Sequence, residues 1–144
     1  MKINFYDEVS DELLKFAVVV SKADGKWVMC KHKQRDTLEV PGGTREKGEA
    51  ILETAKRELY EETGALEYTI EPVCVYSVDD GKAENFGMLY YAEIASLGVL
   101  PDSEIEKVYF LDVLPDNWTY PHIQPQLIKK ICEKYNWGNK NDTV

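Results

Sequence analysis

The segment 49–63 constrains the fold most strongly, because a helix formed by it would be apolar on one face only and could bury only that face. Successive residues on a helix turn by about 100°. This spacing places four apolar residues on one stripe: Ile51, Leu52, Ala55 and Leu59. Gly64 follows where a left-handed helix C-terminus favours glycine. The sequence therefore predicts a helix from about Glu49 to Thr63 that docks its apolar stripe on a sheet.

Three carboxylates lie beside this stripe instead of opposite it. With Glu58 at zero, Glu62 falls at about +40° and Glu61 at about −60° around the helix. Glu61 and Glu62 also stand in the last turn, where the helix dipole disfavours negative charge. Hard oxygen ligands in a cluster suit Mg2+ or Mn2+, whereas no Cys/His set points to zinc. A metal site and an ordinary solvated acidic face both remain open from charge and spacing alone.

Strand-like segments surround this helix. The expected strands are 16–20, 26–31, 68–78, 86–94 and 105–113. Asp24-Gly25 predicts a hairpin turn between the first two strands, and Pro41 with two glycines ends a further short extended piece. A second helix is expected within 121–137, with Leu127, Ile128 and Ile131 at helical spacing. This order predicts an α/β fold, an α/β/α sandwich with a mixed β-sheet between helices.

Length and charge limit the possible functions. The 144 residues predict one domain, residues 1–138, followed by a loose tail at 139–144. A net charge of −9 argues against long nucleic acid as a partner. We expect reduced thiols at the three cysteines, no signal peptide and no membrane span, hence a cytoplasmic protein. It would be a monomer or a homodimer.

The acidic helix lies within a recognisable motif. The match consists of Gly43, five residues, Glu49, seven residues, Arg57-Glu58-Leu59, one residue, Glu61-Glu62, one residue, Gly64 and Ala65. This pattern resembles the Nudix box, and only Ala65 departs from it, being smaller than the usual aliphatic residue. The resemblance implies a Nudix-type sandwich that cleaves a diphosphate linkage. The substrate would be a small-molecule nucleotide (a nucleoside triphosphate or a nucleoside diphosphate joined to a group X), with Mg2+ as cofactor and Mn2+ as a possible substitute.

The resemblance also implies roles for individual residues. The metal ligands would be Gly42, through its carbonyl, with Glu58, Glu61 and Glu62. The catalytic residues would be Glu49, Arg57, Glu58, Glu61 and Glu104. Glu58 is either a ligand or the general base, while Arg57 and Glu49 would orient the ligands. Glu104 is the candidate for the carboxylate that family members draw from a later loop as base or ligand; Asp102 and Glu106 flank it, and a solvated loop acid is the alternative.

Substrate contacts are expected outside the box. The candidates are Lys31, Lys33, Arg35 and Arg45 for phosphate, Trp118 for stacking on a base, and Gln124 for reading it. Solubilising surface charge and loop packing are the alternatives. Ile123 stands where MutT-type members hold a guanine-reading asparagine, which puts guanine selection in doubt.

Two other functions remain possible. One is an RNA 5′-triphosphate pyrophosphohydrolase, against which the acidic charge weighs. The other is a non-catalytic nucleotide-sensing or protein-binding Nudix module. Such modules usually lose box carboxylates, and this chain keeps them all.

Overall fold

The computed structural model describes residues 1–137, so the predicted tail at 139–144 lies outside the described residues. The strands are β1 (Lys2–Tyr6), β2 (Leu14–Ala23), β3 (Lys26–His32), β4 (Leu38–Glu39), β5 (Gly42–Thr44), β6 (Ala65–Asp79), β7 (Glu84–Leu97) and β8 (Ile105–Leu111). The helices are the 3-10 turn η1 (Asp11–Leu13), α1 (Ile51–Thr63) and α2 (Gln124–Lys134).

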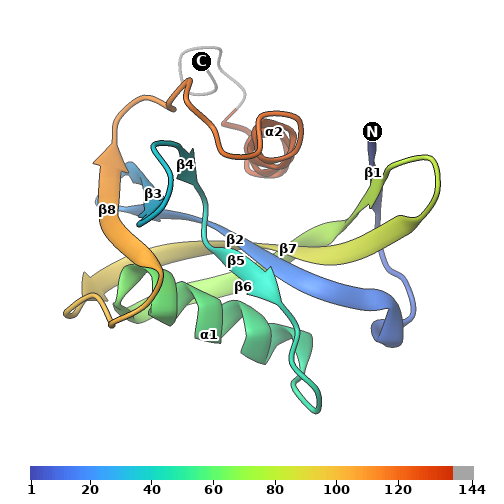
Figure 1. Ribbon diagram of the computed structural model, residues 1–144, viewed down its shortest axis with the longest axis horizontal. Coiled ribbons are helices and arrows are strands. Elements are labelled where there is room, and N and C mark those ends of the chain that lie inside the picture. Colours follow the sequence, from blue (N-terminus) through green and yellow to red (C-terminus); the bar gives the residue numbers. More distant parts are fainter. Residues whose placement is uncertain (138–144) are drawn as a thin grey trace.

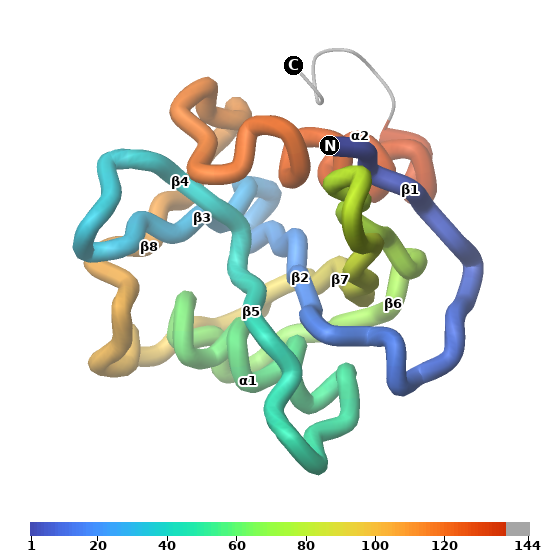
Figure 2. Tube along the Cα trace, turned by 45° about the vertical axis from the view of Figure 1, so that its right-hand side comes forward, coloured from blue at the N-terminus to red at the C-terminus, as the bar shows by residue number. Residues whose placement is uncertain are grey.

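The strands form one mixed sheet between the two helices. Its order is β1-β6-β7-β2-β3-β4, with β5 added to β2 and β8 added to β3. The β2–β7 pair is parallel, and the other pairs are antiparallel. Figures 1 and 2 show α1 on one face of the sheet and α2 on the other. The predicted α/β/α sandwich is therefore confirmed.

Strand β2 explains why both faces are covered. Its side chains alternate between the two sides of the sheet, as in any strand. Val18 and Val20 belong to the core beneath α2, whereas Ala17 and Val19 belong to the core beneath α1. All four are buried. A strand that is apolar on both faces requires a cover on each, and the two helices supply it.

The two turns that the sequence singled out are present. Asp24 and Gly25 both have positive φ, 52° and 77°, as a tight two-residue hairpin between β2 and β3 requires. Gly64 ends α1 in the left-handed conformation, with φ of 78°. A Cβ at Gly64 would also lie only 3.0 Å from the carbonyl oxygen of Gly98. Glycine is thus required there by both conformation and space.

Several details differ from expectation. Gly42 and Gly43 do not merely end an extended piece, since they form β5 and pair with Val18 and Ala17 of β2. Strand β1 was not predicted, and α1 begins at Ile51 rather than near Glu49. Leu52 is 39% exposed, because it lies in the first turn of α1 at the far edge of the apolar stripe.

All three cysteines, Cys30, Cys74 and Cys132, are buried and free of disulfides. Burial raises the pKa of the Cys30 and Cys74 thiols above the ordinary value. Their location in the core agrees with the expected reduced thiols.

Candidate active site

Two glycines of β5 bring the main chain against two carboxylates of α1. The backbone N–H of Gly42 donates a hydrogen bond to Oε1 of Glu62 at 2.9 Å. The carboxylate of Glu58 lies so close to Gly43 that a Cβ added there would overlap it. A side chain at position 43 would therefore push β5 and α1 apart, whereas one at position 42 would press on the backbone of β2.

The site raises the pKa of its two partly buried carboxyls, those of Glu58 and Glu62. Burial raises the pKa of Glu62 to about 8. The hydrogen bond from the Gly42 N–H lowers this pKa, but by less than burial raises it. The negative charges of Glu58, Glu39 and Glu61 raise it further. Burial also raises the pKa of Glu58, opposed by the positive charge of Arg57. A carboxyl of this kind holds a proton near neutral pH unless a cation replaces it.

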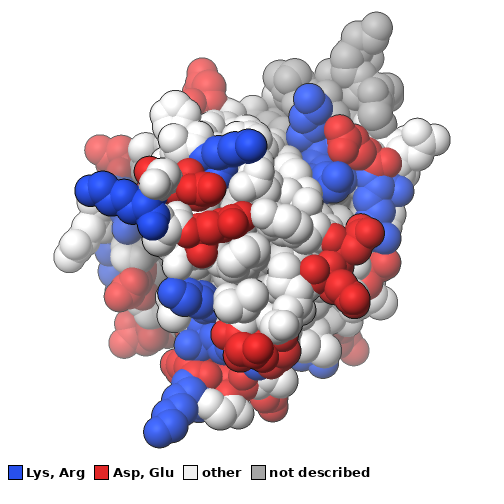
Figure 3. Space-filling model, turned by 90° about the vertical axis from the view of Figure 1, so that its right-hand side faces the viewer, with Lys and Arg blue, Asp and Glu red and all other residues white. Residues whose placement is uncertain are grey.

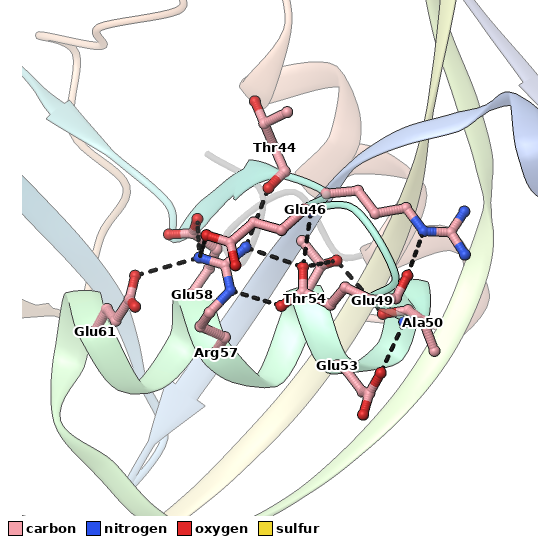
Figure 4. Close-up of polar contacts among 10 residues, drawn as sticks. Thr44, Glu46, Glu49, Ala50, Glu53, Thr54, Arg57, Glu58 and Glu61 are labelled. Carbon is pink, nitrogen blue, oxygen red and sulfur yellow. Dashed lines mark hydrogen bonds and ion pairs between the residues drawn. The ribbon is translucent and has the colours of Figure 1, made fainter.

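Arg57 occupies the centre of the acidic cluster (Figure 4). Its Nη1 donates to Oε2 of Glu58 at 3.0 Å and to Oε1 of Glu61 at 3.4 Å. Its Nη2 donates to the carbonyl oxygen of Thr44 at 3.1 Å, just beyond the β5 glycines. One guanidinium group thus orients two α1 carboxylates and the strand that faces them.

Glu49 fixes the opposite side of this guanidinium group. It accepts from Nε of Arg57 at 2.7 Å, from the hydroxyl of Thr54 at 2.6 Å and from the backbone N–H of Glu46 at 3.0 Å. These hydrogen bonds, led by that from Arg57, lower the pKa of Glu49 to about 2. Glu49 therefore stays ionised and ties the loop before α1 to the helix.

The donor chemistry of this cluster suits a hard divalent cation. Among residues 1–137, no three His, Cys, Asp or Glu side chains form a ready-made metal set. Within the described chain Glu62 nevertheless lacks a basic partner, while Glu58 and Glu61 both contact Arg57. A buried carboxylate without a compensating charge is costly. The all-oxygen cluster fits Mg2+ or Mn2+, which would supply that charge.

An acidic cavity of about 430 Å³ opens beside the C-terminal part of α1. It is lined by Glu58, Glu61 and Glu62 from the helix and by residues 101–105 from the loop before β8. Figure 1 shows this loop beside the end of α1. Glu104 therefore lines the same cavity as the box carboxylates. It also contacts His32, the last residue of β3, across 72 positions of the chain. Its catalytic role stays a prediction.

Glu104 is held in place by the end of β3. Its Oε2 lies 2.8 Å from Nε2 of His32, and its carbonyl oxygen accepts from the backbone N–H of Lys33 at 2.8 Å. The sequence assigned His32 no role. The sequence shows only that His32 stands between two lysines at the end of a strand. That position gives no indication of a partner 72 residues along the chain.

Two predicted phosphate ligands are also paired with acids: Lys31 of β3 with a residue of β8, and Lys33, just after β3, with a residue of the loop before β8. Lys31 donates to Glu106, and Nζ of Lys33 lies 3.6 Å from Asp102. Lys33 keeps half of its side chain exposed. Asp102, the partner of Lys33, lines the acidic cavity. The contact of either lysine with phosphate stays a prediction.

A second cavity, of about 340 Å³, lies on the other side of the β5 glycines beneath α2. Its walls are mostly apolar: Phe16, Val18, Val40, Tyr76, Val78, Ile123 and Leu127. Gln124 contributes a polar group, since its Oε1 accepts from the backbone N–H of Val40 at 2.9 Å. That bond fixes the amide, so its Nε2 is the free donor, and Nε2 has no hydrogen-bond partner within residues 1–137.

Two residues without a predicted role also line this second cavity. Glu39 is buried and accepts from Nη1 of Arg35 at 2.9 Å, and Tyr120 stands at the start of the turn before α2. The sequence signal that could have drawn attention to Glu39 was a charged residue between two apolar ones, Leu38 and Val40. Arg35, a predicted phosphate ligand, is thus placed beside the apolar cavity through its ion pair with Glu39.

Two further predicted substrate ligands have structural partners. Arg45 donates to the carbonyl oxygens of Glu49, Asp11 and Leu14 and to the Asp11 carboxylate, so binding phosphate would require it to exchange partners. Trp118 packs against the core beneath α2 and does not line the second cavity. The substrate contacts of both stay predictions.

Comparison with known proteins agrees with this geometry. The family model described as NUDIX domain matches residues 12–124. The chain is 30% identical over 118 residues to the candidate 8-oxo-dGTP diphosphatase YtkD of Bacillus subtilis (strain 168), an alignment that covers 81% of this chain and 74% of that protein. It is 32% identical over 103 residues to the ADP-ribose pyrophosphatase of the same strain. That alignment covers 68% of this chain but only 55% of the ADP-ribose pyrophosphatase.

A solved structure is similar over nearly the whole chain. The crystal structure of the Bacillus subtilis pyrophosphohydrolase BsRppH superposes with a TM-score of 0.77 at 25% identity. The match covers 92% of this chain and 90% of that one. The sheet and both helices described above are therefore shared with a protein of this kind.

Proposed function

The chain belongs to the Nudix family of hydrolases, and from this premise we propose that it is a Mg2+-dependent pyrophosphohydrolase of small nucleotides. The substrate would be a nucleoside triphosphate or a nucleoside diphosphate joined to a group X. Water would attack phosphorus and break the diphosphate linkage. Glu58, Glu61, Glu62 and the carbonyl of Gly42 would hold the cation.

One observation carries this proposal: Gly42 and Gly43 form a wall shared by two different environments. On one side they contact Glu62 and Glu58. On the other side they line the apolar cavity beneath α2. A nucleoside in the apolar cavity could therefore extend its phosphates past a side-chain-free strand to the carboxylates. Small-molecule sites commonly combine an apolar cavity with a few placed polar groups in this way.

The chain's own residues would divide the chemistry among them. A bound divalent cation would lower the pKa of the attacking water and would neutralise negative charge on the phosphate oxygens. Arg57 would keep Glu58 and Glu61 in place, and Glu49 would in turn keep Arg57 in place. Glu104, across the acidic cavity, would accept the proton of the attacking water, with Glu58 as the alternative general base.

The charge of the protein supports a small substrate. The net charge is −9, and on the face shown in Figure 3 basic residues alternate with acidic ones without forming a wide basic area. Long nucleic acids bind through extended basic surfaces. No helix within residues 1–137 has the length and apolarity needed to cross a membrane. We propose a single domain over 1–138 that acts in the cytoplasm as a monomer or homodimer.

A substrate panel tests the proposal. The purified protein is incubated with Mg2+ and, separately, with nucleoside triphosphates (8-oxo-dGTP included), ADP-ribose, dinucleoside polyphosphates and triphosphorylated RNA. Released phosphate and pyrophosphate are then measured, with EDTA as the control. Hydrolysis of a small nucleotide supports the proposal. Preferential hydrolysis of triphosphorylated RNA would show that RNA, and not a small nucleotide, is the substrate. If no member of the panel is hydrolysed, a non-catalytic nucleotide-binding module is favoured.

A further inference from the structure

His32 and Glu104 form a pair at the rim of the acidic cavity. Nε2 of His32 lies 2.8 Å from Oε2 of Glu104. The following residue of the chain adds a second link, since the backbone N–H of Lys33 donates to the carbonyl oxygen of Glu104. Both the main chain and the side chain of Glu104 are thus anchored to the end of β3.

A local irregularity of the sheet creates this pair. Lys31 stands opposite Lys107, but the next residue of β3, His32, stands opposite Ile105, so β8 contains one extra residue at this point. Such a bulge changes the direction of nearby side chains and is frequent beside active sites. Here Glu106 pairs with Lys31 while Glu104 pairs with His32.

The two partners differ strongly in exposure. The imidazole of His32 is 18% exposed, whereas the carboxylate of Glu104 is 82% exposed. An exposed glutamate samples many rotamers. Glu104 also shares its cavity with the carboxyl groups of Glu58, Glu61 and Glu62, and each of them that is ionised repels it. The largely buried imidazole supplies a fixed donor that opposes both effects.

We propose that His32 is a positioning residue, which holds the carboxylate of Glu104 at the wall of the acidic cavity. The inference rests on the proposed function, in which Glu104 accepts the proton of the attacking water. His32 acts through Glu104 and need not touch the substrate. Removing the imidazole donor should therefore lower kcat while leaving nucleotide binding nearly unchanged.

Four single substitutions and one double variant test this role on the nucleotide that the panel identifies. His32→Phe keeps the ring volume but removes the donor, and should lower kcat by about ten- to a hundredfold with KM within about twofold. His32→Gln restores a donor and should recover most of the lost rate. In Glu104→Gln, adding His32→Phe should cause little further loss. His122→Gln, at the exposed second histidine, is the matched control and should behave as the unmodified protein.

A second measurement detects the pair without activity. In protein labelled with 15N at histidine, Glu104→Gln should shift the Nε2 resonance of His32, and Glu106→Gln should not. Normal kcat in His32→Phe, or an unmoved resonance in Glu104→Gln, would overturn the inference while leaving the hydrolase proposal intact. Absence of hydrolysis across the whole panel would overturn both, even if the resonance moved.

Discussion

The carboxylate of Glu62 accepts a hydrogen bond from the backbone N–H of Gly42 at 2.9 Å. This bond joins the C-terminal turn of α1 to β5, and it places a partly buried acid at the helix end that disfavours negative charge. Burial there raises the pKa of Glu62 to about 8. The first prediction follows from this raised pKa.

Metal-free protein should lose stability as the pH rises through the neutral range. The pKa of Glu62 is raised from 4.5 in the ordinary case to about 8 in the folded protein, so between these values the folded state binds a proton that the unfolded state has released. The stabilisation is complete below pH 4.5 and is lost as the pH rises through 8, by at most about 1.4 kcal/mol per pH unit. Urea unfolding in EDTA at pH 5 to 9 measures it.

Glu62→Gln is the control for this pH dependence. Its amide cannot titrate, so the free energy of unfolding should vary less between pH 5 and 8 than in the unmodified protein. Mg2+ should stabilise the unmodified protein more at pH 8 than at pH 5, because the ion competes with the proton for the same oxygens. An identical pH dependence in both proteins would show that Glu62 does not hold this proton.

Gly43→Ala should disturb the carboxylate of Glu58. The added Cβ would overlap that carboxylate, which must then move away from β5. We expect weaker Mg2+ binding by calorimetry and at least about tenfold lower activity. Ala50→Gly, which removes a methyl group from the exposed start of α1, is a suitable control. Unchanged Mg2+ binding in Gly43→Ala would contradict the close approach of Gly43 and Glu58.

Arg57→Lys should not preserve activity, although it preserves charge. Arg57 contacts Glu49, Glu58 and the carbonyl of Thr44 through three different nitrogens, and a lysine ammonium cannot reproduce this fork. We expect a loss of about ten- to a hundredfold in kcat/KM. Lys56→Arg, at the neighbouring exposed position, should have little effect. Full activity in Arg57→Lys would reduce the role of Arg57 to that of a surface charge.

Gln124→Glu should weaken substrate binding and also lower stability, because it places a carboxylate at a buried position beside the apolar cavity. The new carboxylate can still accept from the N–H of Val40, but it lacks the Nε2 donor that faces the apolar cavity. We expect KM to rise roughly five- to tenfold with little change in kcat. Gln124→Leu should in addition destabilise the protein by about 1–3 kcal/mol, because it leaves the N–H of Val40 unpaired. An unchanged KM in Gln124→Glu would exclude this amide from the nucleotide site.

The local features of the fold could be read from the sequence. Helix α1 and its end at Gly64, and the turn at Asp24-Gly25, depend on neighbouring residues and were predicted correctly. Strand β1 escaped prediction because its partner is β6, 69 to 77 positions along the chain, and such pairing leaves no local signal. The pairing of Gly42 and Gly43 with β2 escaped for the same reason.

In the candidate site, too, local features could be predicted from the sequence and long-range contacts could not. The spacing of Glu58, Glu61 and Glu62 already placed these carboxylates together beside the buried face of one helix. The pair of His32 and Glu104 could not be predicted, because it depends on a bulge between β3 and β8. The apolar cavity also escaped, since its walls come from several strands and α2.

The Mg2+ dependence of hydrolysis in Glu62→Gln tests the central claim most directly. The unmodified protein and the variant are assayed on the same nucleotide over a range of Mg2+ concentrations, after circular dichroism has shown that both are folded. The account predicts that activity of the unmodified protein saturates with Mg2+ and vanishes in EDTA, and that the variant is at least about a hundredfold less active. Full activity in Glu62→Gln, or hydrolysis that persists in EDTA, would contradict it.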